Sequence, residues 1–418
     1  MINSSARRMI FRVLERLRDA HLELVTPDGR THSFGDAGAS LHATIAVRRE
    51  RFFSRVLWGG DEGTGDAYVD GDWTTPDLVA VTRMAVRNQQ HIEKRGGALG
   101  WVSGVANRVR HLHNRNTLDG SRRNIAAHYD LSNDFFRLFL DRNMLYSSAI
   151  YETPKTSLED AQIEKVDRLC RKLGLSPKDR ILEIGTGWGG FAIHAATHYG
   201  CHVTTTTISR QQHDYAAARF AQHRLNGQIE LLLEDYRKLR GQFDKIASIE
   251  MFEAVGLEHY DDFFGACDRL LVSDGVMAMQ TITMNERHFD DYQKGSDWIQ
   301  RRIFPGAQLA SLKEIQNSLG RCTALNIHGL EDIGLHYAYT LAEWRRRFLA
   351  ATGDVRALGF DEPFLRTWDY YLACCEGMFR ERHIGDVQLV LAKAGCLRAL
   401  PGEPWALSPA YSDKEVNA

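Results

Sequence analysis

The feature that most constrains the fold of this 418-residue chain is a short apolar run ending in clustered glycines, "ILEIGTGWGG", residues 181–190. An apolar run of this length is typical of a buried strand, and residues 190–200 have the apolar spacing of a helix with a glycine stop. Glycines let the backbone approach a ligand closely, and the start of a helix offers free N–H groups. The stretch therefore predicts a strand, a binding loop and a helix.

The sequence around this stretch continues the same alternation. Strand-like runs cover residues 202–209, 228–235, 245–250 and 275–283, and helical segments such as 209–225 and 258–271 separate them. Regular alternation of strands and helices is typical of an α/β doubly wound sheet with helices on both faces. In such sheets ligands bind beyond the carboxyl ends of the strands.

The glycines are compatible with more than one cofactor. Gly185, Gly187 and Gly190 satisfy the G-x-G-x-x-G pattern of a dinucleotide site. That site also needs an acidic residue about 20 residues further on, to bind the ribose hydroxyls. Here that window holds four threonines, residues 204–207, and no carboxylate. S-adenosylmethionine fits better, because its cation would benefit from an acid such as Glu183; glycines that only form a tight turn are the remaining alternative.

Composition excludes several classes of protein. No run of apolar residues is long enough to span a bilayer, and the N-terminus lacks the apolar core of a secretory signal. The seven cysteines show no C-x-x-C spacing, which favours neither a disulfide framework nor a zinc site. We therefore expect a cytoplasmic protein without a metal centre.

The net charge of −2 conceals a basic surplus in residues 1–123, which is densest over 83–123. This surplus is typical either of a solvated helical face or linker, or of a surface attracted to anionic lipid headgroups. No zinc-finger, helix-turn-helix or RNP-like pattern accompanies it, so nucleic acid is not an expected partner. Residues 1–120 are predicted to form a small N-terminal domain, suited to membrane or lipid docking. The tail, 397–418, is expected to be poorly ordered.

Within that domain, two stretches carry local predictions. Ile10, Leu14 and Leu17 recur at helical spacing and predict a stripe that faces the core. Residues 61–78 are rich in Gly and Asp, which favours turns, with Tyr68 and Trp73 as an aromatic anchor pair.

Several ordered motifs carry a family resemblance. Residues 122–140, 144–152, 206–212, 250–256, 303–306 and 336–348, together with the glycine loop, resemble the cyclopropane fatty acid synthase family, which includes the mycolic acid methyltransferases. The resemblance spans about residues 122–395. It implies an α/β fold: a Rossmann-like class I methyltransferase sheet over residues 121–396, with inserted cap helices that shape a channel for an acyl chain.

The resemblance also implies an activity. S-adenosylmethionine would donate a methyl(ene) group to the double bond of an unsaturated acyl chain of a membrane phospholipid, forming a cyclopropane. C-methylation of the same substrate, giving a methylene- or methyl-branched chain, is the alternative, and a non-catalytic lipid-binding protein on this fold is a candidate of another class. Peripheral association with the inner face of an anionic membrane and a homodimer are further expectations.

The catalytic residues implied by the family surround a bound bicarbonate that acts as the base. Glu253 and Tyr337 match the family glutamate and tyrosine. A helix N-terminal carboxylate and a core tyrosine are the structural alternatives for these two. Ser148 replaces the family cysteine and Gln280 replaces the family histidine, which makes bicarbonate less secure and favours the branched products. Ile282 belongs to the same motif as Gln280 and is counted with the catalytic set.

Two further motifs need an interpretation. Cys375 matches a cysteine once regarded as catalytic in relatives, although a buried structural thiol is the favoured interpretation. The "HYD" triplet, residues 128–130, has no partners at metal-ligand spacing and is expected to have a structural or lid role.

The resemblance assigns cofactor contacts as well. Gln212 is expected to bind ribose hydroxyls, and Asp235 with Tyr236 is expected near the adenine. The full set is Tyr146, Ser147, Glu183, Gly185, Thr186, Gly187, Trp188, Gly189, Thr207, Ile208, Gln212, Asp235 and Tyr236.

Overall fold

The computed structural model describes residues 2–93, 131–394 and 396. The predicted tail, the "HYD" triplet and most of the basic segment 83–123 lie outside the described residues. Within the described residues, no helix combines the length and the hydropathy needed to cross a bilayer.

The N-terminal elements form a small mixed unit. Its sheet has the order β2-β1-β3-β4, and three helices complete it. The elements are α1 (Ile2–Leu14), β1 (His21–Val25), β2 (Thr31–Gly35), β3 (His42–Val47), α2 (Arg51–Val69), β4 (Trp73–Thr74) and α3 (Leu78–Glu93). Ile10 is buried in the core, and Leu14 and Leu17 pack against it, as the helical spacing predicts.

The prediction of turns over residues 61–78 is wrong for its first half. Helix α2 continues to Val69, after a kink at Gly60 (φ 56°). Glycine has a low helix propensity, but tertiary packing requires it here. A Cβ at Gly65 would lie 2.6 Å from the indole nitrogen of Trp298. The aromatic pair is present, with the rings of Tyr68 and Trp73 5.1 Å apart.

The second sheet has seven strands in the order β10-β11-β9-β8-β5-β6-β7. The five strands from β9 to β7 in this order pair in parallel, and β11 is antiparallel to both of its neighbours. The bounds are β5 (Arg180–Ile184), β6 (His202–Thr206), β7 (Ile229–Leu232), β8 (Phe243–Ile249), β9 (Leu271–Met284), β10 (Leu325–Asp332) and β11 (Ile384–Lys393). The predicted class I methyltransferase sheet is confirmed.

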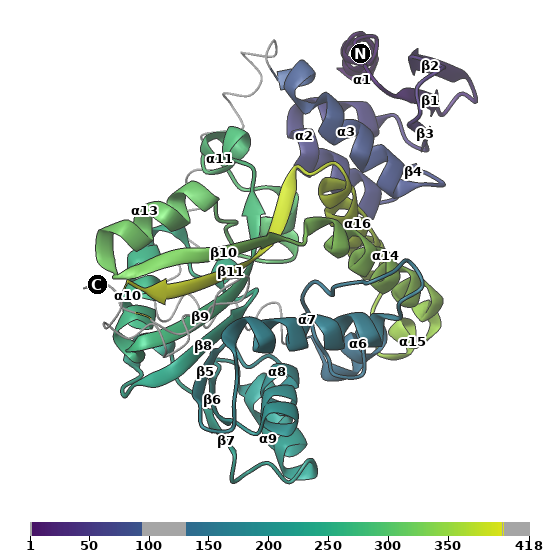
Figure 1. The fold of residues 1–418 in the computed structure, drawn as a ribbon. Coiled ribbons are helices and arrows are strands. Elements are labelled where there is room, and N and C mark those ends of the chain that lie inside the picture. Colours follow the sequence, from purple (N-terminus) through teal and green to yellow (C-terminus); the bar gives the residue numbers. More distant parts are fainter. Residues whose placement is uncertain (1, 94–130, 395, 397–418) are drawn as a thin grey trace.

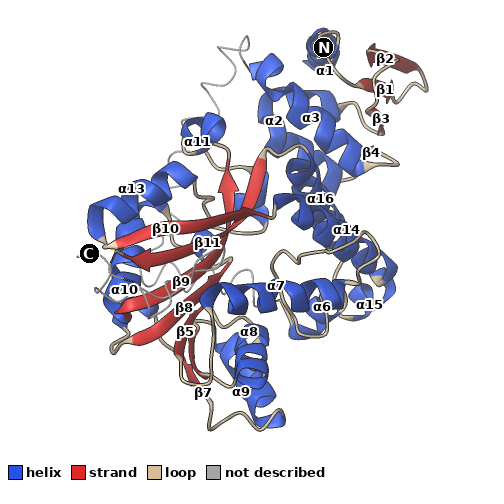
Figure 2. Ribbon diagram, in the orientation of Figure 1, coloured by secondary structure: helices blue, strands red, loops and turns tan. Residues whose placement is uncertain are grey.

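Helices cover both faces of this sheet (Figure 2). Successive residues of a strand point to opposite faces, and accordingly Ile181 and Leu182 of β5 belong to different apolar cores. One core lies under α7 (Leu158–Leu173), α8 (Gly190–His194), the π-helical turn Ala195–Tyr199 and α9 (Arg210–Gln222). The other lies under α10 (Tyr260–Leu270) and α13 (Leu312–Cys322).

The remaining helices form the predicted cap. They are α6 (Asn133–Arg137), α11 (Glu286–Tyr292), α12 (Trp298–Arg302), α14 (Gly334–Ala350), α15 (Thr352–Ala357) and α16 (Glu362–Arg380). Outside the cap, short 3-10 helices follow β7 (Tyr236–Lys238) and β8 (Phe252–Ala254 and Leu257–His259). Figure 1 shows α16 between α3 of the N-terminal unit and α14 of the cap. The Tyr68 hydroxyl donates to Asp369 of α16 at 2.7 Å, so this helix joins the N-terminal unit to the cap.

Candidate active site

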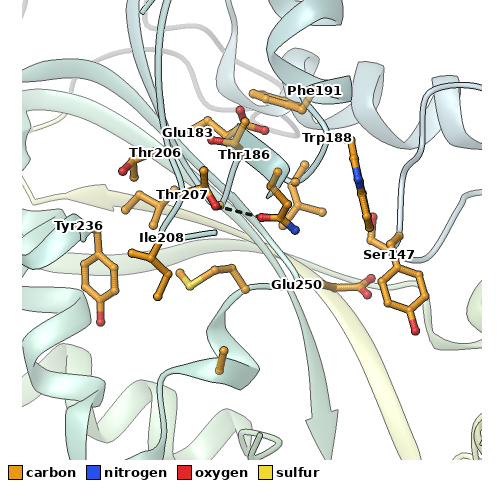
Figure 3. A pocket seen from close by; sticks show the side chains of 18 of the residues that line it. Ser147, Glu183, Thr186, Trp188, Phe191, Thr206, Thr207, Ile208, Tyr236 and Glu250 are labelled. Carbon is orange, nitrogen blue, oxygen red and sulfur yellow. Dashed lines mark hydrogen bonds between the residues drawn. The ribbon is translucent and has the colours of Figure 1, made fainter. Parts of the chain in front are cut away.

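The glycine loop joins β5 to α8 at the carboxyl edge of the sheet. Gly185 (φ 101°) and Gly187 (φ 52°) have left-handed backbone conformations that favour glycine. A Cβ at Gly185 would also lie 3.1 Å from the side chain of Met251. The loop and the ends of β6 and β8 line a pocket, which we call the cofactor pocket (Figure 3).

All residues predicted to contact the cofactor line this pocket except Gly189. Figure 3 shows Tyr236 at one end of the pocket and Ser147 with Glu250 at the other. Gly189 instead precedes α8 with φ 84°, and a Cβ there would lie 2.6 Å from the ring of Phe220. Gly189 packs the loop against α9, and its assignment as a cofactor contact stays a prediction.

Two pairs of side chains at the pocket wall are held in fixed orientations. The Thr207 hydroxyl donates to the amide oxygen of Gln212 at 2.9 Å, and this bond orients the amide (Figure 3). The Asp235 carboxylate accepts two hydrogen bonds from the Arg237 guanidinium, at 2.8 and 2.7 Å. The cofactor pocket therefore presents polar groups that do not need to reorganise.

Glu183 places a carboxyl group in the cofactor pocket. Its side chain is buried on β5 and accepts a hydrogen bond from the Thr205 hydroxyl at 2.6 Å. Burial raises the pKa of Glu183 to about 8. The group is therefore largely neutral at pH 7, and a bound cation would favour its ionised form.

A second pocket lies under the cap helices, and we call it the apolar pocket. Its walls come mainly from the loop 304–309, α12, α14, α16 and the end of β9, with Tyr292 from the end of α11. Hydrophobic side chains dominate the lining: Ile282, Met284, Tyr292, Ile299, Phe304, Leu309, Leu341, Tyr371, Met378, Phe379 and Ile384. Tyr146, Glu250 and Ala254 line both pockets, so the two cavities meet at these residues.

Glu250 is the central polar group at this junction. It follows β8 with φ 47°, a conformation that is strained for a residue other than glycine. Its Oε1 accepts the backbone N–H of Ser148 and an amide N–H of Gln280, both at 2.7 Å. Its Oε2 accepts the Tyr337 hydroxyl at 2.7 Å. Burial raises the pKa of Glu250, whereas the positive charge of Lys165 and these three hydrogen bonds favour its anion.

This geometry corrects the predicted arrangement around the base. Ser148, Gln280 and Tyr337 were expected to surround a bicarbonate together with Glu253, but in the structure all three donate to Glu250. Ser148 contributes its backbone N–H, while its hydroxyl donates to the Ala149 carbonyl at 3.1 Å. The donor set is filled by a carboxylate of the protein, so the residues present do not fit a separate bicarbonate.

Glu253 lies apart from this donor set. Its Oε1 accepts the backbone N–H of Ile282 at 2.5 Å and the Thr281 hydroxyl at 3.0 Å. Its Oε2 has no hydrogen-bond partner among the described residues, and the residue lines the apolar pocket. Burial and the nearby negative charge of Glu250 raise the pKa of Glu253 to about 7. Glu253 and Ile282 line the apolar pocket together with Tyr337, whose hydroxyl donates to Glu250 and not to Glu253.

Glu250 is therefore the residue that sequence reasoning missed. Its signal was its place at the carboxyl end of the predicted strand 245–250, where α/β sheets bind ligands.

Cys375 lines the apolar pocket, and burial raises the pKa of its thiol well above the usual value. A catalytic thiolate is therefore disfavoured, although the side chain is only partly buried. No group of described side chains is arranged to hold a metal ion.

Comparison with known proteins identifies the family. Residues 116–389 match the family model described as mycolic acid cyclopropane synthetase. The chain belongs to this family. It is 36% identical over 384 residues to the tuberculostearic acid methyltransferase UfaA1 of Mycobacterium tuberculosis, covering 90% of this chain and 88% of the relative. It is also 36% identical over 369 residues to the cyclopropane-fatty-acyl-phospholipid synthase of Escherichia coli, covering 85% of this chain and 89% of that relative.

Solved structures of mycolic acid cyclopropane synthases share the fold. CmaA1, in complex with SAH (S-adenosylhomocysteine) and CTAB, matches with 34% identity and a TM-score of 0.61, covering 65% of this chain and 98% of that chain. MmaA2 of Mycobacterium tuberculosis matches with 31% identity and the same TM-score, again covering 65% and 98%. As a member of the cyclopropane synthetase family, the protein is an S-adenosylmethionine-dependent methyltransferase.

The raised pKa of Glu183 leads to a first prediction. Below pH 8 its carboxyl group carries a proton. The carboxyl group must release this proton before it can form an ion pair with the sulfonium cation. The apparent Kd for S-adenosylmethionine is therefore expected to fall as pH rises from about 6 to 8, by up to about tenfold per pH unit. Calorimetric titrations at several pH values measure this slope. Glu183→Gln should bind more weakly with a flat profile, and a steep profile in that variant would assign the titration to another group.

Proposed function

We propose that the protein transfers a methyl group from S-adenosylmethionine to the double bond of an unsaturated acyl chain of a membrane phospholipid and closes a cyclopropane ring. The observation that carries this proposal is the position of Glu250, which lines both the cofactor pocket and the apolar pocket. A base at that junction faces the methyl carbon as it moves from one pocket to the other.

The cofactor pocket has the features that S-adenosylmethionine requires. The backbone of Gly185 and Gly187 offers room for its amino-acid end, Glu183 offers a carboxylate for its cation, and Gln212 offers an amide for its ribose. Asp235 and Tyr236 line the end that we assign to the adenine. When bound, the cofactor supplies an electrophilic methyl group.

The apolar pocket has the features that an acyl chain requires. An alkene is a weak nucleophile, so the pocket must hold its π face in line with the methyl group. The aromatic rings of Tyr146, Phe304 and Tyr371 stand around this position, with the Phe304 and Tyr371 rings 5.7 Å apart. Such rings stabilise a cation on the lipid and exclude the water that would trap it as an alcohol.

Glu250 then completes the reaction. The carboxylate takes a proton from the transferred methyl group, and the electron pair of that C–H bond closes the ring onto the neighbouring cationic carbon. The hydrogen bonds from Tyr337, Gln280 and the Ser148 backbone hold the carboxylate in place during this transfer.

The branched products are a second candidate for the same site. The relative named tuberculostearic acid methyltransferase supports them, as does the replacement of the family cysteine and histidine by Ser148 and Gln280. The phospholipid substrate is supported by the Escherichia coli relative alone. Three hydrogen bonds hold the Glu250 carboxylate at the junction of the two pockets, where a catalytic base is needed. This arrangement argues against a non-catalytic lipid-binding protein.

The N-terminal unit is our candidate for docking on the inner face of an anionic membrane, in a protein otherwise located in the cytoplasm. Trp58 of α2 is 62% exposed, and indole side chains favour the boundary between lipid and water. Helix α2 also packs against α12, whose Ile299 lines the apolar pocket. A homodimer stays a prediction.

The deciding experiment uses purified protein, methyl-labelled S-adenosylmethionine and vesicles of unsaturated anionic phospholipid, analysed by mass spectrometry. A labelled acyl chain that has lost its unsaturation and resists mild hydrogenation supports ring closure. A labelled chain that still carries a double bond selects the branched product. If the cofactor binds but no lipid is labelled, this function is overturned.

A further inference from the structure

A second carboxyl group lies directly behind Glu250. Asp386 belongs to β11, opposite Ile282 of β9, and its side chain is fully buried. Its Oδ2 accepts a hydrogen bond from the Gln280 amide at 3.1 Å, and the same amide nitrogen donates to Glu250 at 2.7 Å. The Gln280 amide nitrogen therefore joins the two carboxyl groups. None of the motifs in the sequence pointed to this residue.

Two buried carboxyl groups that share one amide donor repel each other when both are ionised, so one of them holds a proton. Glu250 accepts three hydrogen bonds from Ser148, Gln280 and Tyr337, and these stabilise its negative charge. Asp386 accepts one hydrogen bond, and its Oδ1 has no partner among the described residues. The unequal donor sets place the charge on Glu250 and the proton on Asp386.

The nearby cation agrees with this distribution. Lys165 of α7 is fully buried, and its Nζ donates to the Ser147 hydroxyl at 2.5 Å. Among the carboxylates around it, Glu250 has the largest effect in opposing the loss of its charge. One buried positive charge offsets one negative charge, and a second anion at Asp386 would be left without compensation.

We propose that Asp386 is a positioning residue that holds this proton, so that Glu250 stays ionised and aimed at the junction of the two pockets. The inference rests on the function proposed for Glu250. Burial and the neighbouring negative charges of Glu250 and Glu253 raise the pKa of Asp386 well above its ordinary value, as this assignment requires. Lys165 and the Tyr337 hydroxyl are the other ionisable groups that face the pair.

Two substitutions of Asp386 separate positioning from simple packing. Asn presents an N–H in place of the carboxyl O–H and can still donate to Glu250, whereas Leu keeps a similar volume without a donor. We expect Asp386→Asn to keep kcat within about threefold of the wild type, and Asp386→Leu to lower kcat by roughly tenfold or more. The KM for S-adenosylmethionine should stay within about twofold in both variants, because Asp386 does not line the cofactor pocket.

Asp291→Asn removes one partner of an exposed ion pair with Lys294; it is the matched control and should behave as the wild type. Equal loss of kcat in the Asn and Leu variants would overturn the proposal, because it would show that Asp386 must ionise. Wild-type kcat in the Leu variant would overturn it as well.

Infrared spectroscopy tests the proton without using activity. Labelling the aspartates with ¹³C shifts the C=O absorption of protonated aspartic acids away from that of protonated Glu183 and Glu253. The difference between labelled wild type and labelled Asp386→Asn should show the loss of one protonated carboxyl group. An unchanged spectrum would overturn the assignment. Because this measurement needs no lipid, it stands even if the vesicle experiment fails to show methyl transfer.

Discussion

Glu250→Gln is expected to lose turnover by roughly a hundred- to ten-thousand-fold, the range that removal of a general base typically produces. The amide has almost the same shape as the carboxylate but cannot accept the proton of the methyl group. Binding of S-adenosylhomocysteine, followed by the shift in melting temperature, should stay close to that of the wild type, because the glycine loop is unchanged. Steady-state rates with labelled S-adenosylmethionine measure the loss.

Glu258→Gln is the matched control, because Glu258 is exposed on the 3-10 helix Leu257–His259, within the same segment of chain. It should keep wild-type turnover. If Glu250→Gln loses cofactor binding together with turnover, Glu250 has a structural role instead. If Glu253→Gln alone abolishes turnover, the base is Glu253, whose Oε2 lies in the apolar pocket wall.

The second prediction with a large effect concerns bicarbonate. The wild-type enzyme should keep its rate in buffer freed of carbon dioxide, because the donors of Ser148, Gln280 and Tyr337 already hold Glu250. Glu250→Gly removes that carboxylate and leaves the three donors facing a space of similar size. Turnover should fall as in Glu250→Gln, and added bicarbonate or formate should restore it by about tenfold or more.

Glu250→Gln serves as the control for this rescue, because its amide fills the space and should leave the small anions without effect. Saturation of the rescue with anion concentration would indicate a specific site. A wild-type rate that falls on removal of bicarbonate would contradict the replacement of bicarbonate by Glu250.

The sheet and the cofactor pocket could be predicted from sequence because their determinants are local. Gly185 and Gly187 are contiguous with the strand that they follow, and alternation of apolar runs identifies the neighbouring strands. The helical course of residues 61–69 could not be predicted, because Gly65 is explained by Trp298, more than two hundred residues away.

The polar centre of the site could not be predicted for the same reason. Glu250 follows β8, Gln280 belongs to β9 and Asp386 belongs to β11, and nothing in their local sequence states that they meet. The family pattern directed attention to Glu253, three residues beyond Glu250. The departures at Ser148 and Gln280 were visible in the sequence, but their common cause, a carboxylate already present at Glu250, required the structure.

Helix α16 has a consequence for the evolution of this architecture. Its Tyr371 and Met378 line the apolar pocket, while its Gly377 leaves room for Thr82 of α3 on another side. The matched family model begins at residue 116, after α1, α2 and α3. Helix α16 therefore contributes both to the apolar pocket of the catalytic unit and to the contact with the N-terminal unit. A descendant that lost the N-terminal unit would expose the face of α16 that contacts α3. Polar side chains would have to replace the apolar ones on that face to keep the protein soluble, and each replacement would lie on the same helix that lines the apolar pocket.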